Sequence, residues 1–169
     1  MDARSESEAK AVKNSTKEER KSDRELVVTR TFDGPARIVW EAWTRPDLFK
    51  RWWIPKTFPV TLLSCEQDIR VGGKYRLVFG HGDSEPKAFF GTYLEVKPQS
   101  RLVWTNDEGA DQVITTVTFE EKGGKTLVVV HDLYPSKEAL DEAITSGSTG
   151  AMNEQLDQLA ELLVTLTAA

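Results

Sequence analysis

The sequence is poor in the residues that cross-link chains or hold metal ions. Cys65 is the only cysteine, and His81 and His131 are the only histidines, among 169 residues. One cysteine excludes an internal disulfide, so the composition does not point to an oxidising compartment. Without paired cysteines or an HExxH motif, neither a structural nor a catalytic zinc site is expected. We therefore predict no metal and no other cofactor.

Long apolar runs and an excess of positive charge are also missing. Apolar runs such as residues 127–130 are far shorter than the roughly 20 residues that cross a bilayer, and residues 1–21 lack the apolar part of a secretory signal. The 22 Lys and Arg against 27 Asp and Glu give a net charge of −5, which disfavours binding to a phosphate backbone. We predict a cytoplasmic protein with neither a membrane segment nor a nucleic-acid partner.

The first 24 residues are almost entirely polar. Lys and Arg are interleaved there with Asp and Glu, and too little apolar surface is present to offset the entropy lost on ordering. We predict a disordered, charged extension over residues 1–24, with a partner-binding arm as the alternative. The folded part is then a single domain over residues 25–167.

Alternating apolar and polar residues predict a series of strands. The pairs Gly72-Gly73 and Gly123-Gly124 join neighbouring runs, because glycine permits the backbone angles of tight turns. Most connections are short, so these strands should pair antiparallel. The seven predicted strands cover residues 25–32, 60–67, 74–79, 88–96, 101–106, 112–121 and 126–132.

Two short helices are predicted after the first strand. Residues 33–35 combine an Asx or Gly cap with a proline in the first turn, which is typical of a helix start. Residues 44–47 have the capping-box pattern, and the second helix should carry Trp52 and Trp53 before Pro55 ends it. The pair should support one end of a curved sheet.

The chain returns to helical spacing after the last strand. A short helix is predicted over residues 137–145, a break over 146–150 and a long helix over 152–166. One face of the long helix carries an apolar stripe, and this stripe should lie on the sheet.

These elements and several motifs together resemble one known family. The motifs are PARIVWEAW, RPDLFKRWW, DIRVGG, FFGTYLEV, RLVWTN and NEQLDQLAELL. They are similar to the SRPBCC (START/Bet v 1-like) superfamily, and within it to the AHSA1 (activator of Hsp90 ATPase homologue 1-like) family. The resemblance implies an α+β helix-grip (Bet v 1-like) fold, in which a curved seven-stranded antiparallel sheet wraps around a long C-terminal helix and leaves a cavity. It also implies ligand binding in single-domain bacterial members and co-chaperone activity in larger relatives.

Two positions depart from the pattern of this family. Asn106 stands where relatives often carry an aromatic residue, and Ala151-Met152 stands where many carry a tryptophan. Both differences should change the pocket rather than the fold. The ligand of a relative would therefore transfer poorly to this chain.

Several polar residues are candidates for chemistry. Asp68 and Arg70, two apart on a strand, should share a face as a buried or half-buried ion pair that supports the hairpin, with a catalytic carboxylate as the alternative. His131 lies on a strand face that we expect to point inward, as a structural hydrogen-bonding group or as a group that orients a ligand or moves a proton. Cys65 precedes Glu66 on a strand, so its thiol is not expected to be an activated nucleophile.

The expected inner faces of the strands and of the last helix are aromatic and apolar, with a few polar groups. Alternation alone is compatible both with a solid core and with a small-molecule pocket, and the resemblance favours the pocket. The residues expected to contact a ligand are Trp53, Tyr75, Leu77, Phe79, Phe89, Trp104, Asn106, Val117, His131, Met152 and Leu156.

Three functions follow as hypotheses. The first is binding of a small hydrophobic or aromatic molecule between the sheet and the C-terminal helix. The second is an enzyme of the cyclase, aromatase or hydrolase kind in the same cavity, with His131, Asp68 or Tyr75 as acid or base. The third is a chaperone-associated interaction module, which would need a large exposed apolar patch. A homodimer or a chaperone contact is thus the alternative to a small ligand as partner.

Overall fold

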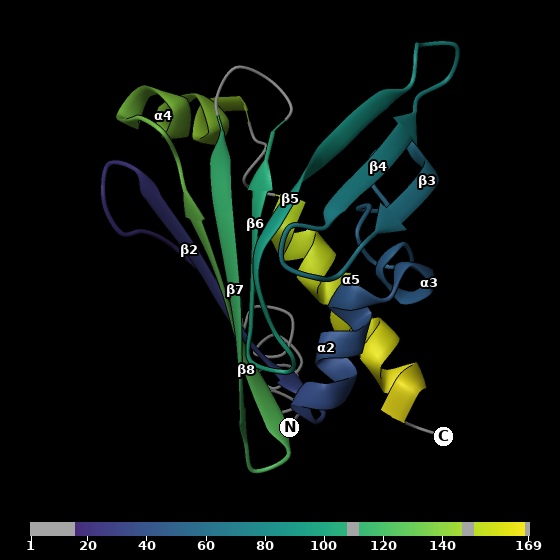
Figure 1. The fold of residues 1–169 in the computed structure, drawn as a ribbon, viewed down its shortest axis with the longest axis vertical. Helices are drawn as coiled ribbons and strands as arrows, with labels where there is room; N and C mark the ends of the chain where they lie inside the picture. Colours follow the sequence, from purple (N-terminus) through teal and green to yellow (C-terminus); the bar gives the residue numbers. More distant parts are fainter. Residues whose placement is uncertain (1–15, 108–111, 147–150, 168–169) are drawn as a thin grey trace, which may run out of the picture.

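The computed structural model describes residues 16–107, 112–146 and 151–167. Within these ranges eight strands form an antiparallel sheet in the order β1-β2-β8-β7-β6-β5-β4-β3 (Figure 1). The predicted strands are confirmed, and their ends differ from the observed ones by one residue at most. The bounds are β1 Lys17–Arg20, β2 Glu25–Asp33, β3 Thr61–Gln67, β4 Lys74–Gly80, β5 Lys87–Lys97, β6 Arg101–Asn106, β7 Val113–Lys122 and β8 Lys125–Leu133.

Strand β1 corrects the prediction for the N-terminal extension and raises the strand count from seven to eight. Its residues pair with β2, from Lys17 opposite Thr29 to Arg20 opposite Leu26. All of them are exposed. Main-chain hydrogen bonds to a sheet edge need no apolar side chains, so the composition of this segment gave no sign of a strand. Residues 1–15, for which we also predict disorder, lie outside the described residues.

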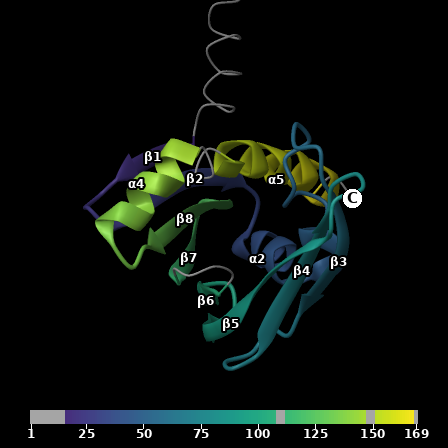
Figure 2. The same ribbon diagram turned by 90° about the horizontal axis from the view of Figure 1, so that it is seen from above.

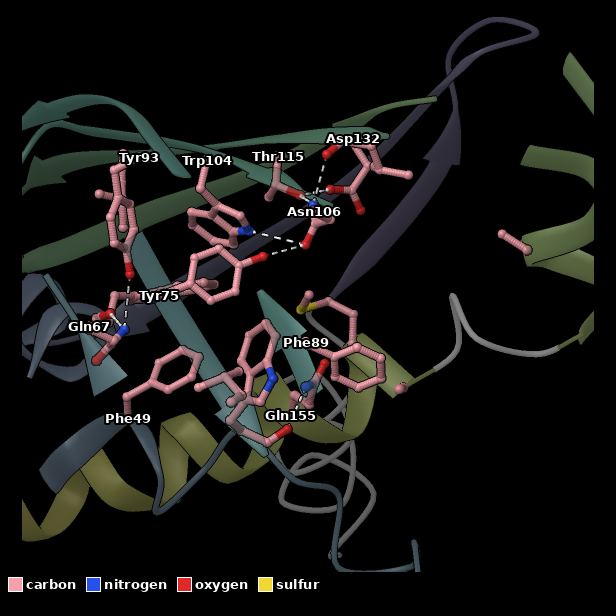
Figure 3. Close-up of a pocket in the computed structure, with 18 of the residues that line it drawn as sticks. Phe49, Gln67, Tyr75, Phe89, Tyr93, Trp104, Asn106, Thr115, Asp132 and Gln155 are labelled. Atoms are coloured by element: carbon pink, nitrogen blue, oxygen red, sulfur yellow. Dashed lines mark hydrogen bonds between the residues drawn. The ribbon is translucent and has the colours of Figure 1, made fainter. Parts of the chain in front are cut away.

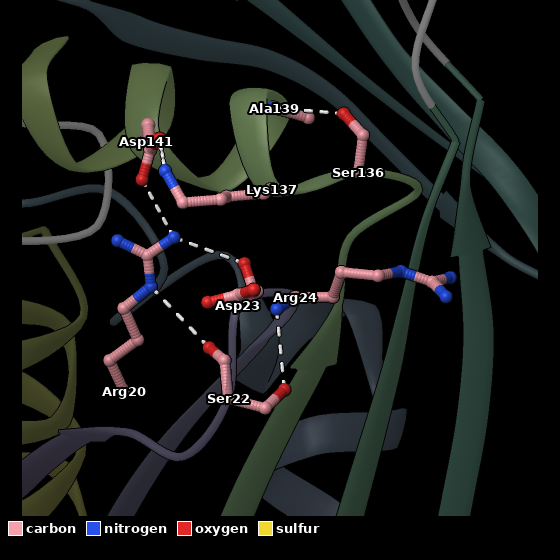
Figure 4. A network of polar contacts seen from close by, with 8 residues as sticks. All are labelled: Arg20, Ser22, Asp23, Arg24, Ser136, Lys137, Ala139 and Asp141. Carbon is pink, nitrogen blue, oxygen red and sulfur yellow. Dashed lines mark hydrogen bonds and ion pairs between the residues drawn. The ribbon is translucent and has the colours of Figure 1, made fainter.

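A polar network joins β1 and its following turn to helix α4 (Lys137–Ser146), as Figure 4 shows. Arg20 Nη2 lies 2.7 Å from Asp141 Oδ1 and donates to the Asp23 carbonyl at 3.0 Å. Lys137 Nζ reaches the other carboxylate oxygen of Asp141 at 2.9 Å. Exposed ion pairs contribute about 0–1 kcal/mol each. Charged side chains of this kind also make a sheet edge a poor template for a further strand.

The helices are short except for the last one. Their bounds are α2 Ala36–Thr44, α3 Pro46–Phe49, α4 Lys137–Ser146 and α5 Ala151–Thr167. The two C-terminal helices are confirmed, whereas residues 147–150 of the predicted break lie outside the described residues. None of the helices in the described ranges is long and apolar enough to cross a bilayer.

The predicted caps of the two short helices are wrong. The first N–H of α2, on Ala36, donates to Glu121 Oε1 of β7 at 2.8 Å, so a distant carboxylate takes the place of the Asx or Gly cap. Thr44 donates its hydroxyl to the Trp40 carbonyl at 2.8 Å and does not cap α3. Since α3 ends at Phe49, the tryptophan pair follows this helix rather than lying in it.

The sheet bends along β5. Gly91 is opposite Tyr75 of β4, and a Cβ atom at Gly91 would lie 1.7 Å from the Thr105 carbonyl oxygen of β6. Only glycine permits this close approach of two backbones. A register shift between Tyr93 and Glu95 follows on the same strand. The bend divides the sheet into two wings, and α5 crosses its concave side (Figures 1 and 2).

Side chains fill one end of the concave face, where α2 contacts β7, β8 and α5. Trp40 and Trp43 meet the ring of Phe119 edge-on, with ring centroids 5.4 and 6.2 Å apart. We call this region the closed end; its buried residues are Phe32, Val39, Phe119, Val128, Leu159 and Leu163.

A buried glutamine fixes the segment after α3 to helix α5. Gln158 Nε2 donates to the carbonyls of Trp52 and Ile54 at 3.0 and 2.8 Å, and Gln158 Oε1 accepts the Lys56 N–H at 2.8 Å. Trp52 is fully buried and donates its indole N–H to the Ala42 carbonyl at 2.9 Å. The neighbouring Trp53 is only partly buried and turns toward the other end of the concave face.

Candidate functional site

The hairpin between β3 and β4 is architectural. Asp68 and Arg70 form an ion pair at 2.9 Å, but their side chains are 52% and 69% exposed, so the predicted buried or half-buried pair is wrong. A Cβ atom at Gly73 would lie 2.1 Å from the Asp68 carbonyl oxygen, and Gly72 has a φ of 85°. The turn binds β5, since the N–H of Tyr93 donates to the Gly73 carbonyl at 2.8 Å. Asp68 is therefore remote from any chemistry inside the fold.

His131 points away from the concave face, contrary to prediction. Its Nε2 lies 2.7 Å from Glu25 Oε2 on the outer face of the sheet, and the hydrogen bond lowers the pKa of the Glu25 carboxyl. On the same strand Val128 and Val130 are buried, and they face inward. Because residues on both faces of β8 are apolar, the sequence pattern does not reveal which face is inner.

The open end of the concave face contains a cavity of about 400 Å³ (Figure 3). It lies between the sheet, the start of α5 and the segment after α3, and it opens to solvent on one side. Its volume falls in the range of about 300–1,000 Å³ that small-molecule sites occupy. We call it the cavity. Of the residues predicted to contact a ligand, it is lined by Trp53, Tyr75, Leu77, Phe89, Trp104, Asn106 and Met152.

The other predicted contact residues do not line the cavity. Val117 and Leu156 are fully buried in the core. Phe79 packs on Phe89 with ring centroids 5.0 Å apart and lies behind the wall. Alternation assigned these side chains to the inner faces of their strands or helix, but it could not tell which part of that face is covered.

The sequence pattern missed several lining residues, and the most important of them is Asp132. Asp132 follows His131 and therefore projects to the opposite, inner face of β8. If Val128 and Val130 had been assigned to the inner face, Asp132 would have been predicted there as well, because residues two apart on a strand share a face. The lining residues that were not among the expected contact residues also include Trp43, Phe49, Gln67, Tyr93, Leu102, Val113, Thr115, Tyr134, Ala143, Ala151 and Gln155, of which Tyr93, Leu102 and Thr115 lie on faces expected to point inward.

A chain of hydrogen bonds runs along the sheet wall of the cavity, as Figure 3 shows. The Trp104 indole donates to Asn106 Oδ1 at 3.3 Å, and the Tyr75 hydroxyl lies 3.1 Å from the same oxygen. Asn106 Nδ2 donates to Thr115 Oγ1 at 3.0 Å, and Thr115 donates to Asp132 Oδ1 at 2.6 Å. The amide of Asn106 orients the chain, which an aromatic residue in its place would break. Trp104, Asn106 and Thr115 each donate in the direction of the carboxylate, whereas the Tyr75 hydroxyl donates to the Thr105 carbonyl at 2.9 Å.

Burial raises the pKa of Asp132 to about 6, while the hydrogen bond from Thr115 and the nearby His131 act in the opposite direction. Two tyrosines and the cysteine in or near the cavity remain neutral near pH 7. Burial raises the pKa of Tyr134 to about 12 and that of the Cys65 thiol to about 11, and it also raises the pKa of Tyr93. The raised thiol pKa agrees with the expectation that Cys65 is not an activated nucleophile.

Polar contacts also position the wall opposite Asp132. Gln67 Nε2 donates to the Trp43 carbonyl at 3.2 Å and lies 3.4 Å from the Tyr93 hydroxyl. Gln155 of α5 donates to the Trp53 carbonyl. In residues 16–107, 112–146 and 151–167, no group of three or more His, Cys, Asp or Glu side chains is arranged to hold a metal ion.

The strand order, the bend and the long helix across the concave side define a helix-grip fold with an internal cavity. Residues 33–164 match the family model described as activator of Hsp90 ATPase homolog 1-like protein, and the chain belongs to this family. No curated protein matches the sequence.

Solved structures share the fold at low sequence identity. A protein of Rhodobacter sphaeroides superimposes with a TM-score of 0.81 and 21% identity, over 89% of this chain and 99% of the other. A protein of Nitrosomonas europaea gives 0.77 and 22%, over 89% and 100%. A protein of Chromobacterium violaceum gives 0.70 and 26%, over 82% and 96%. The likeness covers the whole domain.

Proposed function

We propose that the protein binds a small aromatic or hydrophobic molecule in the cavity between the sheet and α5. The observation that carries this proposal is an aromatic-walled cavity of about 400 Å³ with a hydrogen-bonded polar chain on its sheet wall. Sites of this kind take most of their affinity from apolar contact and their orientation from a few fixed polar groups. The ligand's body would contact Trp53, Phe89 and Met152, and its polar group would meet Asn106 and Asp132.

Titration calorimetry with naphthylmethanol, a neutral aromatic probe, tests the proposal. The probe has about a dozen non-hydrogen atoms, and roughly 0.5 kcal/mol per atom gives a Kd of tens of micromolar. Met152→Trp places an indole at the cavity wall, and we expect it to weaken binding by about ten-fold or more.

Val164→Trp is the matched control, because Val164 lies on the same helix with 67% of its surface exposed. This variant should bind the probe like the unmodified protein. Absence of binding to the unmodified protein, or equal binding by both tryptophan variants, would overturn the proposal.

A second candidate function is acid–base catalysis in the same cavity. The observation that favours it is the pKa of Asp132, which burial raises to about 6 and thus toward the pH at which a carboxyl group can both accept and donate a proton. Asp132 would take the role that the sequence assigned to His131 or Asp68. Recovery of a bound ligand chemically unchanged after long incubation would exclude this candidate.

The chaperone-associated alternative gains no comparable support. Among the described residues, the large apolar side chains that are exposed are spread over several elements: Phe58, Leu63, Val71, Phe89, Phe90, Leu94, Ile144 and Val164. We therefore place the function in the cavity.

A further inference from the structure

The charge inside the cavity is one-sided. Of the described residues that line it, Asp132 is the only one with a side chain that carries a formal charge near neutral pH. No lysine, arginine or histidine side chain lines the wall within those residues. A carboxylate in an apolar site without a positive partner is costly, and a ligand that supplies the partner recovers that energy.

The neighbouring hydrogen bonds leave room for such a partner. In the described part of the chain Asp132 receives one hydrogen bond, from Thr115 to Oδ1. An ionised carboxylate has about four acceptor positions on its two oxygens, so most of its capacity is not used by the protein. Asp132 as a residue is only half-buried and lines the cavity, so a ligand that enters the cavity can reach it.

The nearest charged groups outside the cavity have partners of their own. His131 is paired with Glu25 on the outer face of the sheet and acts on Asp132 only from that face. On α5, Asp157 binds Arg30 and Glu154 accepts the Thr57 hydroxyl at 2.6 Å, and neither side chain lines the cavity.

The two helix ends at the cavity have opposite partial charges. Ala143, in the last part of α4, lines the wall beside Ala151 and Met152 in the first turn of α5. A helix C-terminus is partially negative and a helix N-terminus partially positive, so the two effects oppose each other. The charge preference of the site is then set by Asp132.

Aromatic faces near a carboxylate also favour a positive ligand. Trp104 joins the hydrogen-bond chain that ends at Asp132, and Tyr134 lies two residues beyond it on the same wall. The faces of indole and phenol rings attract cations, and the attraction is strongest where water is excluded. An alkylammonium group gains from both kinds of contact.

We infer that the cavity is selective for an organic monocation with an aromatic or apolar body, such as an arylalkyl amine, whose ammonium group pairs with the carboxylate of Asp132. The inference rests on the proposed function, since it names the chemical class of the ligand. It distinguishes this chain from a general hydrophobic binder, because a neutral or anionic molecule of the same shape leaves the carboxylate unpaired.

Three probes of matched shape test the inference by calorimetry: naphthylmethylamine, naphthylmethanol and naphthoate. Above about pH 7 the amine should bind about ten-fold or more tightly than the alcohol, because hydrogen bonds to charged groups are stronger than neutral ones, and naphthoate should bind most weakly. Asp132→Asn should remove the preference for the amine, so that the amine and the alcohol bind this variant with affinities within about two-fold of each other. Asp68→Asn removes the same charge at an exposed position and should leave the preference unchanged.

The unmodified protein supplies a second readout that does not depend on a variant. Groups that face Asp132 inside the cavity are the Thr115 hydroxyl of β7, the amide of Asn106 on β6, the neutral phenol of Tyr134 and, from the helices, Met152 and Ala143. His131 acts on Asp132 electrostatically from the outer face of β8, equally for every probe, so the difference between amine and alcohol isolates Asp132, whose pKa burial raises to about 6. Amine binding near that pH should therefore release a proton, seen as a binding heat that changes with the ionisation enthalpy of the buffer, whereas alcohol binding should not.

The outcomes separate the two levels of the proposal. If the alcohol binds and the amine binds no better, or if Asp132→Asn keeps the amine preference, the cation inference is wrong and the aromatic-ligand proposal stands. If none of the three probes binds, both are wrong. Amine preference that disappears in Asp132→Asn and persists in Asp68→Asn, together with proton release, supports both.

Discussion

The two ends of the concave face are built from the same kinds of side chain, but they differ in what covers them. At the closed end, α2 and the last turns of α5 lie on the sheet, and Phe119, Val128 and Leu163 are buried in continuous contact. At the open end, the start of α5, Phe49, Trp53 and Ala143 surround the sheet without filling the space above it, and the inner face lines a cavity of about 400 Å³. Where the helices no longer cover the sheet, the same kind of inner face lines a cavity instead of a packed core.

The difference in cover extends to polar groups. The core side chains of the closed end are apolar and the buried Arg30 beside them is paired with Asp157, whereas the open end has a chain of hydrogen bonds that terminates at Asp132. A buried carboxylate weakens folding unless a partner compensates it, so its place at the open end is typical of a functional residue rather than of a structural one.

The largest change in stability is expected at the closed end, where the side chains are packed without a cavity. Phe119→Ala should lower the free energy of unfolding by about 3–5 kcal/mol, because the ring is 5% exposed and its loss leaves a void beneath Trp40 and Trp43. Urea denaturation followed by circular dichroism measures the change. A loss below about 1 kcal/mol would mean that the closed end is not tightly packed.

The next effect concerns the pH dependence of stability. Burial raises the pKa of Asp132 from 3.8 to about 6, so the folded protein retains a proton that the unfolded chain has already lost. Stability should therefore fall as the pH rises from about 4 to about 6, by on the order of 2 kcal/mol. Asp132→Asn lacks this titration, so above about pH 6 it should be more stable than the unmodified protein by that amount, and below about pH 4 equally stable.

Denaturation curves of both proteins across this pH range measure the difference. Parallel pH profiles of stability for the two proteins would show that burial does not raise the pKa of Asp132 in the folded state. A lower stability of Asp132→Asn at neutral pH would contradict the sign of the effect.

A smaller effect is expected at the mouth of the cavity. Phe89 is 39% exposed, so Phe89→Ala should change the free energy of unfolding by less than about 1 kcal/mol. The same variant should weaken naphthylmethanol binding by about five-fold, because the ring forms part of the cavity wall. Calorimetry and denaturation on one protein sample separate the two results, and loss of stability without loss of affinity would assign Phe89 to the core instead.

The smallest effect is expected for the histidine that the sequence placed in the site. His131→Asn removes an ion pair in which the two side chains are 29% and 36% exposed, and stability should change by at most about 0.5 kcal/mol. Naphthylmethanol affinity should stay the same, because His131 lies on the outer face of the sheet. A marked loss of affinity in this variant would show that the assignment of inner and outer faces on β8 is wrong.

Most of the fold could be predicted because its signals are local. Alternation, paired glycines and an apolar stripe located seven strands and the two C-terminal helices almost to the residue. Strand β1 was not predicted because its pairing with β2 uses main-chain hydrogen bonds and leaves no pattern of apolar side chains. The cap of α2 was not predicted because the group that accepts the Ala36 N–H comes from Glu121, distant in sequence, and the predicted cap of α3 fails because Thr44 donates back to Trp40.

The site was predicted less completely, and β8 explains why. Leu127 and Val129 alternate with Val128 and Val130, so both faces of the strand look equally apolar in the sequence. The choice between them decides whether His131 or Asp132 enters the cavity. It depends on which face α2 and α5 cover, and this is a property of the tertiary structure.

The most direct measurement is a nitrogen-15 NMR titration with naphthylmethanol that follows the indole N–H signals of the tryptophans. Trp104 lines the cavity and donates to Asn106 there, whereas Trp52 donates to Ala42 in the core. We expect the Trp104 signal and the Asn106 side-chain amide to shift with probe concentration while the Trp52 signal stays in place. A saturable shift of Trp52 with an unmoved Trp104, or no saturable shift at all, would contradict a binding site at the open end.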